Sequence, residues 1–310
     1  MSTPPNARLG SALDTQTVAA ANESPTRPFY WSIRRELWEY RSIYIAPFAA
    51  AAVFLAGFLI SMVRLPQKMR ELTALEPMRQ QQVVIQPYIY AALLIMGATF
   101  VVAFFYCLDA LQGERRDRSI LFWKSLPVSD VTTVLSKAAI PLVIIPVITF
   151  AISMLTIWMM YLISMVVLAG SGVGAGMLWS RLPLWQITLT LFYHLIFLHG
   201  LWYAPFYCWL LLVSAWARRM AFLWAVIPVL TLHALEKVVL NTSHFASILH
   251  YRIFGAPSQH TLTSAHLFLG ALDTPRPGEI LAAPGLWIGL MVAAGFLAIA
   301  VRLRRYREPM

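Results

Sequence analysis

The sequence predicts an all-α polytopic membrane protein with six transmembrane helices. Hydrophobic residues make up 59% of the 310-residue chain and charged residues only 12%, against roughly 25% charged in an ordinary soluble domain. The mean hydropathy is +0.66. The apolar residues gather in six long runs, each near or above the ~20 residues that a helix needs to cross a bilayer. A water-soluble fold cannot bury this much apolar surface.

The six predicted spans follow one another between residues 43 and 301. They are Ile43–Val63, Tyr88–Leu108, Ala138–Leu168, Ile187–Ala217, Ala221–Leu240 and Leu286–Val301. Prolines lie inside several spans, at Pro47, Pro141, Pro146, Pro205 and Pro228. Each proline removes a backbone donor and crowds the preceding turn, so we expect kinks at these positions.

The N-terminal region divides into a tail and an amphipathic segment. Residues 1–27 are polar and small, which is typical of a disordered cytoplasmic tail. In residues 28–42, Ile33, Leu37 and Tyr40 share one helical stripe, while Trp31 and Trp38 suit the headgroup layer. This pattern predicts an interfacial helix leading into the first span. A plain basic anchor before that span would explain the same residues.

The distribution of Lys and Arg predicts the orientation. With the N-terminus inside, sixteen of the 24 basic residues fall in inner segments and eight in outer ones. Such a bias favours cytoplasmic placement of both termini. The net charge of +10 then fits cationic flanks that face anionic lipid and cytosol, and it does not indicate nucleic acid.

The segment 109–137, between the second and third spans, is the most charged inner connector. Its start is densely charged from Glu114 to Arg118, and Ile120–Trp123 is densely apolar. A helix of this composition should lie along a membrane surface. Pro127 should end that helix at Leu126, and Ser129 can cap the next one.

The segment 241–285, between the fifth and sixth spans, is the longest outer connector. It contains two short apolar patches, Phe245–Phe254 and Leu262–Leu272, separated by Gly255-Ala256-Pro257. Neither patch is long enough to cross a bilayer. They predict an outer hairpin, formed either by re-entrant helices or by two helices on the surface.

This ordered set of elements resembles the membrane subunit of an ABC-2-type transporter over residues 28–307. The local sequence is similar to the inner loop of that family, in which an acidic-basic start leads to a "Leu-Pro-Val-Ser" turn and a later Lys. The matching residues are Glu114-Arg115, Ser119-Ile120-Leu121, Ser125-Leu126-Pro127-Val128-Ser129 and Lys137. Asp130 stands where a basic residue often follows the turn in the family.

The resemblance implies the permease subunit of an ATP-driven exporter in a bacterial inner membrane. Such a subunit forms the translocation path, pairs with a second permease subunit as a homo- or heterodimer, and docks on a separate ABC ATP-binding subunit. ATP and Mg²⁺ would be bound by that partner, and this chain would hold no cofactor. The inner segment would be a cytoplasmic coupling helix, with ATPase-coupling residues Glu114, Arg115, Arg116, Asp117, Arg118, Phe122, Trp123 and Lys124.

The residues themselves argue against an enzyme and leave one alternative transporter class open. The chain has no Gly-x4-Gly-Lys-Ser/Thr phosphate loop and no His-Glu-x-x-His zinc motif. Cys107 and Cys208 lie in apolar runs, which favours buried, reduced thiols. The alternative is an ion-coupled secondary transporter or channel. Such proteins usually carry ionisable groups in mid-membrane, whereas Asp109 and Glu236 lie at or near span ends.

Overall fold

Helices account for almost every residue that the computed structural model describes. It describes residues 26–72, 76–117, 128–171, 176, 182–254 and 281–306, and no strand occurs in these ranges. Within these ranges, six helices are long and apolar enough to span a membrane: Ser42–Met62, Arg79–Arg116, Asp130–Gly170, Leu184–Trp202, Ala221–Leu240 and Pro284–Tyr306. The predicted all-α class and the number of candidate spans are confirmed.

The described elements follow one another along the chain as consecutive helices. In chain order they are α2 (Thr26–Glu39), α3 (Ser42–Met62), α4 (Leu65–Leu72), α5 (Pro77–Asp109), α6 (Gln112–Arg116), α8 (Asp130–Ala139), η1 (Ile140–Ile144), α9 (Ile145–Gly170), α11 (Leu184–Tyr193), η2 (His194–Trp202), α12 (Ala204–Trp216), α13 (Ala221–Leu235), η3 (Glu236–Leu240), α14 (His244–Phe254) and α17 (Pro284–Tyr306). The three η elements are π-helical.

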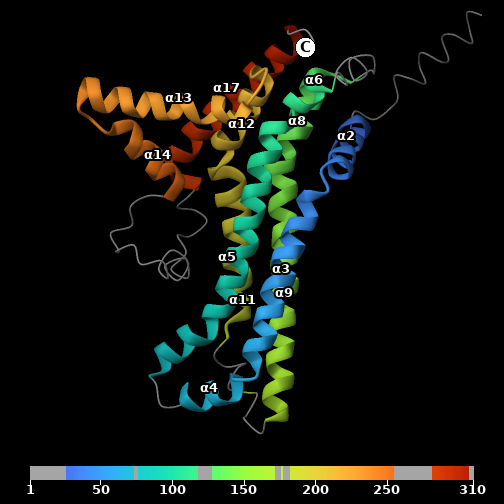
Figure 1. The fold of residues 1–310 in the computed structure, drawn as a ribbon, viewed down its shortest axis with the longest axis vertical. Coiled ribbons are helices and arrows are strands. Elements are labelled where there is room, and N and C mark those ends of the chain that lie inside the picture. The colour runs from blue at the N-terminus through green and yellow to red at the C-terminus, as the bar shows by residue number, and fades with distance from the viewer. Residues whose placement is uncertain are drawn as a thin grey trace, which may run out of the picture.

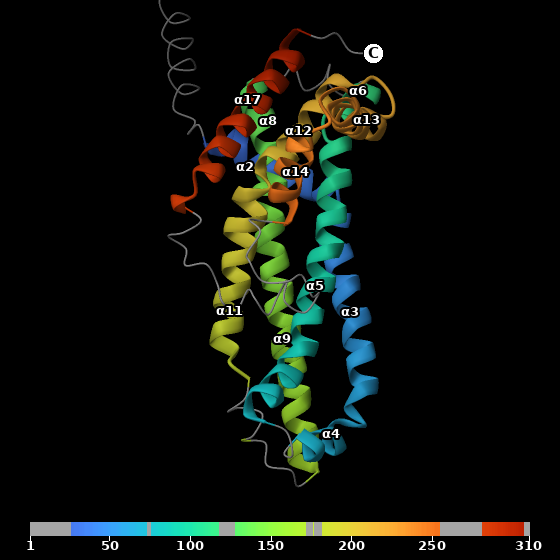
Figure 2. The same cartoon turned by 90° about the vertical axis from the view of Figure 1, so that its left-hand side faces the viewer.

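The long helices α3, α5 and α9 run side by side and form an elongated bundle (Figures 1 and 2). Helix α4 lies at one end of this bundle. Helices α2, α6 and α8, together with the end of α17, lie at the other end. We call the end that carries α6 the inner end and the end that carries α4 the outer end, in keeping with the predicted orientation.

The single span expected over Ile187–Ala217 is two helices in the structure. The helical path is interrupted at Tyr203, whose φ and ψ are −85° and 3°. Pro205 lies in the first turn of α12, where its missing N–H leaves no backbone bond unmade. Pro141 and Pro146 lie within the continuous helical path Asp130–Gly170, where each missing N–H removes a backbone hydrogen bond; η1 contains Pro141 and ends just before Pro146. These three prolines therefore coincide with changes of helix type, whereas Pro47 and Pro228 lie inside the α-helices α3 and α13.

The fifth candidate span has the expected length and composition but an unexpected direction. In both views α13 runs across the bundle axis (Figures 1 and 2), and only 6% of its most apolar window is buried. The turn before it sets this direction, because Ala217 is extended and Met220 has a left-handed φ of 53°. The Trp216 and Trp224 rings pack edge to face at 4.6 Å across the turn.

The predicted outer hairpin is described only in part. Its first apolar patch is helix α14, which the Trp202 indole holds by donating to the Arg252 carbonyl at 2.8 Å. Residues 255–280, which include the second patch, lie outside the described residues, as do residues 1–25 of the predicted tail. The expected interfacial segment 28–42 is helical as α2 up to Glu39, and the helix resumes at Ser42 as α3.

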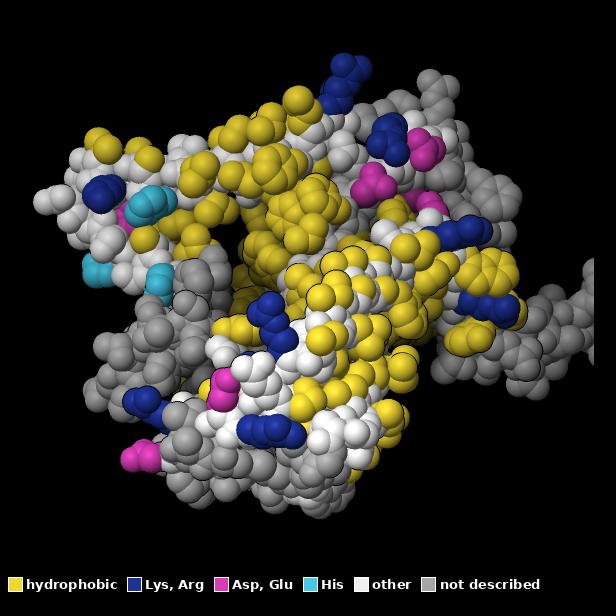
Figure 3. All heavy atoms as spheres, turned by 60° about the horizontal axis from the view of Figure 1, so that its bottom comes forward, with side chains coloured by type: hydrophobic (Ala, Val, Ile, Leu, Met, Phe, Trp, Pro, Cys, Tyr) yellow, Lys and Arg dark blue, Asp and Glu magenta, His cyan; other side chains and the backbone are white. Residues whose placement is uncertain are grey.

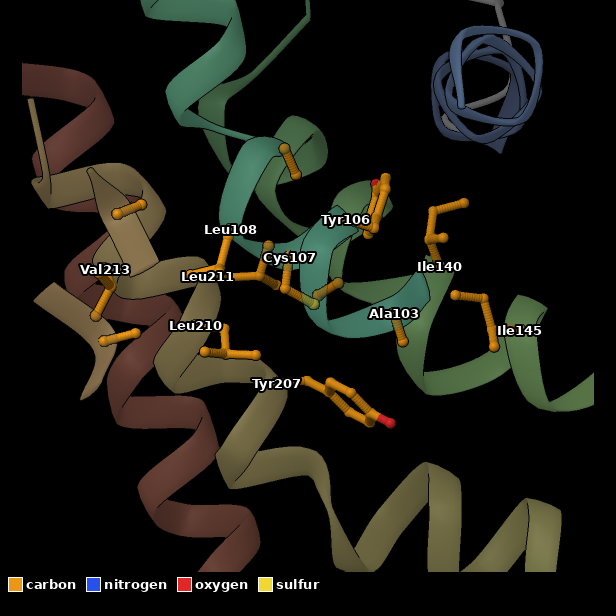
Figure 4. Close-up of a cluster of buried hydrophobic side chains, with 14 of the residues drawn as sticks. Ala103, Tyr106, Cys107, Leu108, Ile140, Ile145, Tyr207, Leu210, Leu211 and Val213 are labelled. Carbon is orange, nitrogen blue, oxygen red and sulfur yellow. The ribbon is translucent and has the colours of Figure 1, made fainter. Parts of the chain in front are cut away.

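Two large apolar cores fill the bundle, one in each half. The outer core includes Phe58, Tyr88 and Met160. In the inner core, side chains of α5, η1 and α12 gather, among them Cys107 and Leu211 (Figure 4). Both cysteines are buried free thiols, as the sequence predicted.

At the inner core, to which η1 contributes side chains, η1 and η2 cross at very short range. A Cβ atom built on Gly200 would lie 2.7 Å from the Leu142 carbonyl oxygen. This separation is well inside van der Waals contact, and the obstacle is backbone, which cannot swing away as a side chain can. Only glycine therefore fits at this crossing.

We predict that Gly200→Ala lowers the free energy of unfolding by roughly 1–3 kcal/mol, because the added methyl group forces the two helices apart. The measurement is thermal unfolding of the purified protein in detergent. Gly97→Ala is the matched control, since nothing lies within 4 Å of a Cβ atom at Gly97. Equal unfolding temperatures for the two variants would contradict the close crossing.

Candidate functional site

Six charged side chains meet at the inner end of the bundle. They come from four elements: Arg35 and Glu36 from α2, Glu114 from α6, Asp130 and Lys137 from α8, and Arg304 from α17. We call this group the charge cluster. Glu36 and Lys137 are only 1% exposed. Glu114 and Arg304 are also buried, whereas Arg35 and Asp130 are partly exposed.

Glu114 is the centre of the charge cluster. Its Oε1 atom accepts from the Arg35 guanidinium at 2.8 Å and lies 3.2 Å from the Lys137 ammonium. Its Oε2 atom accepts from the Arg304 guanidinium. One carboxylate on the inner segment thus contacts cations from the N-terminal helix, the third span and the last span.

Glu36 is the second carboxylate of the charge cluster that bonds to two side chains. Its Oε1 atom accepts from the Lys137 ammonium at 2.7 Å, and its Oε2 atom accepts from the buried Tyr106 hydroxyl at 3.0 Å. At the other edge, the Arg304 Nε atom donates to Asp130 at 3.1 Å. Three carboxylates therefore face three cations. A group whose charges balance in this way avoids the several-kcal/mol penalty of an uncompensated buried charge.

Local structure places these side chains. The Ser129 hydroxyl accepts from the Thr132 backbone N–H at 3.1 Å and caps α8, as the sequence predicted. The cap puts Asp130 in the first turn, where the helix dipole favours a carboxylate. Lys137 lies about two helical turns later and reaches the cluster from the last turn of α8.

The inner segment is clamped onto the end of α12. The Ser214 hydroxyl accepts from the backbone N–H groups of Leu111 and Gln112, at 3.0 and 2.9 Å. The Arg115 guanidinium donates to the carbonyls of Ser214 and Ala217, at 2.7 and 2.8 Å. These carbonyls are at the C-terminus of α12, where a cation is favourable. The start of the inner segment is thus fixed to a further element of the bundle.

The pKa values of Arg35 on α2 and of Tyr40, which follows α2, reflect burial and the carboxylates nearby. Burial alone lowers the pKa of the Arg35 guanidinium, but the Glu36 and Glu114 carboxylates outweigh it and leave that pKa above its ordinary value. Burial, and then the Asp109 carboxylate, raise the pKa of the Tyr40 hydroxyl. Tyr40 therefore stays protonated and donates to Asp109 at 3.0 Å.

The residues predicted to contact an ATPase divide into three groups. Glu114 and Arg115 face inward and are engaged by the bundle, so they do not present a surface to a partner. Arg116 and Asp117 face solvent, with side chains 66% and 64% exposed. Arg118, Phe122, Trp123 and Lys124 lie outside the described residues.

Sequence reasoning missed Arg35, Glu36, Asp130 and Arg304 as members of a site. A signal existed for Glu36, because it lies three residues after Ile33 and four before Tyr40 and so falls on the apolar stripe of α2. No comparable local signal marks Arg304, which follows an apolar span as cationic flanks commonly do.

No protein-family model matches this sequence, and neither a curated protein nor a solved structure is significantly similar to it.

Among the residues that the structure describes, no His, Cys, Asp and Glu side chains form a group of three or more that could hold a metal ion. What the described structure shows at the charge cluster is a set of ion pairs that join α2, α6, α8 and α17.

We predict that Glu114→Gln destabilises the protein by about 3–5 kcal/mol, because it leaves buried cations without their shared counter-charge. The measurement is unfolding of the purified variant in detergent. The exposed Asp117→Asn, three residues away, removes a carboxylate that contacts no helix other than its own and should unfold like the wild type.

A second variant checks the pairing itself. Replacing both partners in Glu114→Gln/Arg304→Gln should destabilise less than the sum of the two single changes, because each single change strands the other charge. Strict additivity would contradict a direct Glu114–Arg304 interaction.

Proposed function

We propose that this chain is the permease subunit of an ATP-driven ABC-2-type exporter. It forms the translocation path with a second permease subunit, in a homo- or heterodimer, and takes its energy from a separate ABC ATP-binding subunit that holds ATP and Mg²⁺. The six apolar helices and the α2 helix before the first span support this proposal, together with the charged segment between the second and third spans.

The observation that carries the proposal is the charge cluster. An ATPase that closes on nucleotide must move the spans through an element that contacts them on the inner side. A partner can shift the bundle from one conformation to another only if it makes different contacts with the two conformations. Glu114 ties the inner segment to α2, α8 and α17, and these helices lead directly into the first, third and sixth candidate spans.

The exposed part of the inner segment is the place where a partner would bind. Arg116 and Asp117 point away from the bundle and lie next to the buried Glu114 and Arg115. In this arrangement the exposed residues set the register of docking, as rim charges do at interfaces. When the partner moves the inner segment, the buried Glu114 and Arg115 side chains transmit that movement to the bundle helices that they contact.

The alternative, an ion-coupled secondary transporter or channel, has one observation in its favour. The buried His199 ring accepts or donates through Nε2 at 2.8 Å from the Tyr207 hydroxyl, within the π-helical part of the bundle. Ionisable groups buried among membrane helices often mark ion pathways. Transport that persists without ATP and stops when the proton gradient is collapsed would select this alternative.

We predict that the chain alone hydrolyses no ATP and gains this activity when it is co-purified with an ATP-binding partner that carries a phosphate loop. Arg116→Glu should lower recovery of that partner, because it reverses an exposed charge at the docking surface, and should leave the unfolding temperature unchanged. Arg79→Glu, an exposed basic residue of the outer end, is the matched control.

Two results would contradict this proposal. One is ATP hydrolysis by the purified chain itself, with contaminating ATPases excluded. The other is equal partner recovery with Arg116→Glu and the wild type, combined with wild-type recovery for Trp123→Ala, since both ends of the expected docking segment would then be dispensable.

The orientation gives a further prediction. Gln67 on α4 and Asp117 after α6 lie at opposite ends of the bundle (Figure 1). In intact cells an impermeant thiol reagent should label Gln67→Cys and leave Asp117→Cys unlabelled until the membrane is opened. Cys107 and Cys208 are buried, so the background should be low. Labelling of Asp117→Cys in intact cells would reverse the assigned orientation.

A further inference from the structure

The outer end of the bundle contains a cavity that the transport proposal does not use. Its volume is about 270 Å³, and it lies between the end of α3, helix α4, the start of α5 and the outer half of α9. Viewed from the outer side, this end carries basic and acidic side chains set among hydrophobic ones (Figure 3). The cavity is therefore separated from the charge cluster by the length of the bundle.

The interior of the cavity is mainly apolar and its rim is polar. Buried Phe58, Met62, Met69 and Val84 line the interior. Exposed residues line the rim, namely Ser61, Lys68, Gln86 and Tyr90. Such a lining suits a ligand with an apolar body and a polar end, since apolar pockets fix ligand orientation with a few polar groups.

One polar group inside the cavity lacks a well-made hydrogen bond. The Tyr88 side chain is 2% exposed, and its hydroxyl makes no hydrogen bond of good geometry within the described residues, although the Ser164 hydroxyl lies beside it. Ser164, on the same wall, donates to the Met160 carbonyl at 2.9 Å. An unmade buried hydrogen bond costs about 1–3 kcal/mol, so a ligand that supplies an acceptor here gains an advantage.

The rim adds a positive charge. Lys68 forms no ion pair with a carboxylate in the described part of the chain. The neighbouring Gln86 amide donates to the Tyr90 hydroxyl at 2.8 Å, which leaves the Tyr90 O–H proton free for a further acceptor. The rim is thus equipped to hold an anion.

We infer that this cavity binds one acyl chain of an anionic phospholipid, with the lipid phosphate at Lys68. The volume is just below the ~300 Å³ at which drug-sized pockets begin, so the cavity accommodates part of one acyl chain and excludes a whole lipid. The ester carbonyl at the head of the chain supplies the acceptor that Tyr88 lacks. The surrounding bilayer supplies the ligand, and the inference does not depend on the proposed transport function.

The test measures lipid binding by the purified, delipidated chain in detergent. Phosphatidylglycerol and phosphatidylcholine with identical acyl chains are titrated separately, and the rise in unfolding temperature gives each affinity. The wild type should prefer phosphatidylglycerol. Lys68→Ala should weaken phosphatidylglycerol binding about fivefold, as expected for one basic residue near a headgroup, and leave phosphatidylcholine binding unchanged.

Arg79→Ala is the matched control for Lys68→Ala. Arg79 is an exposed basic residue in the first turn of α5 and does not line the cavity. It should bind both lipids like the wild type. An equal loss with both variants would mean that the preference is a general charge effect, and the site would be rejected.

Tyr88→Phe distinguishes a lipid site from mere packing. Without lipid it should be as stable as the wild type or more stable, because it removes an unpaired hydroxyl. With lipid it should bind both phospholipids more weakly. Wild-type binding of both phospholipids by Tyr88→Phe and Lys68→Ala would overturn the inference. Tighter binding of a free fatty acid than of phosphatidylglycerol would overturn the choice of ligand.

Discussion

The inner end of this protein depends on the burial of one carboxylate, Glu114. A lone carboxylate inside an apolar bundle would be strongly unfavourable, so its position requires cations around it. Arg35, Lys137 and Arg304 meet this requirement from three different helices. Each of these helices is thereby held at a fixed place relative to the inner segment. The cation at Lys137 in turn permits the burial of Glu36 on α2.

The middle of the bundle is organised by backbone constraints. Proline at Pro141, Pro146 and Pro205 coincides with the start of a new helix or a change of helix type. The crossing of η1 and η2 brings Gly200 against the Leu142 carbonyl with no room for a side chain. π-Helical turns are frequent at functional sites. Here η1 and η2 lie between the charge cluster and the outer cavity, in the region through which movement at one end must pass to reach the other.

The two ends of the bundle therefore have different chemistry. At the inner end, charged side chains satisfy one another and tie α2, α6, α8 and α17 together. At the outer end, Lys68 forms no ion pair and the Tyr88 hydroxyl makes no hydrogen bond of good geometry within the described residues, and both side chains line a cavity between helices. The first arrangement suits the transmission of force between helices. The second suits recognition of a ligand that the membrane itself provides.

The sequence by itself determined the features that depend on local composition and periodicity. These are the all-α class, the candidate spans, the helix before the first span and the Ser129 cap, because hydropathy and capping act within a few residues. The tertiary structure decided the break at Tyr203, the crosswise direction of α13 and the inward orientation of Glu114 and Arg115. It also decided the partners of Glu114. Arg35 and Arg304 are distant from it in sequence, and an ion pair between such residues depends on how whole helices pack, which no local pattern encodes.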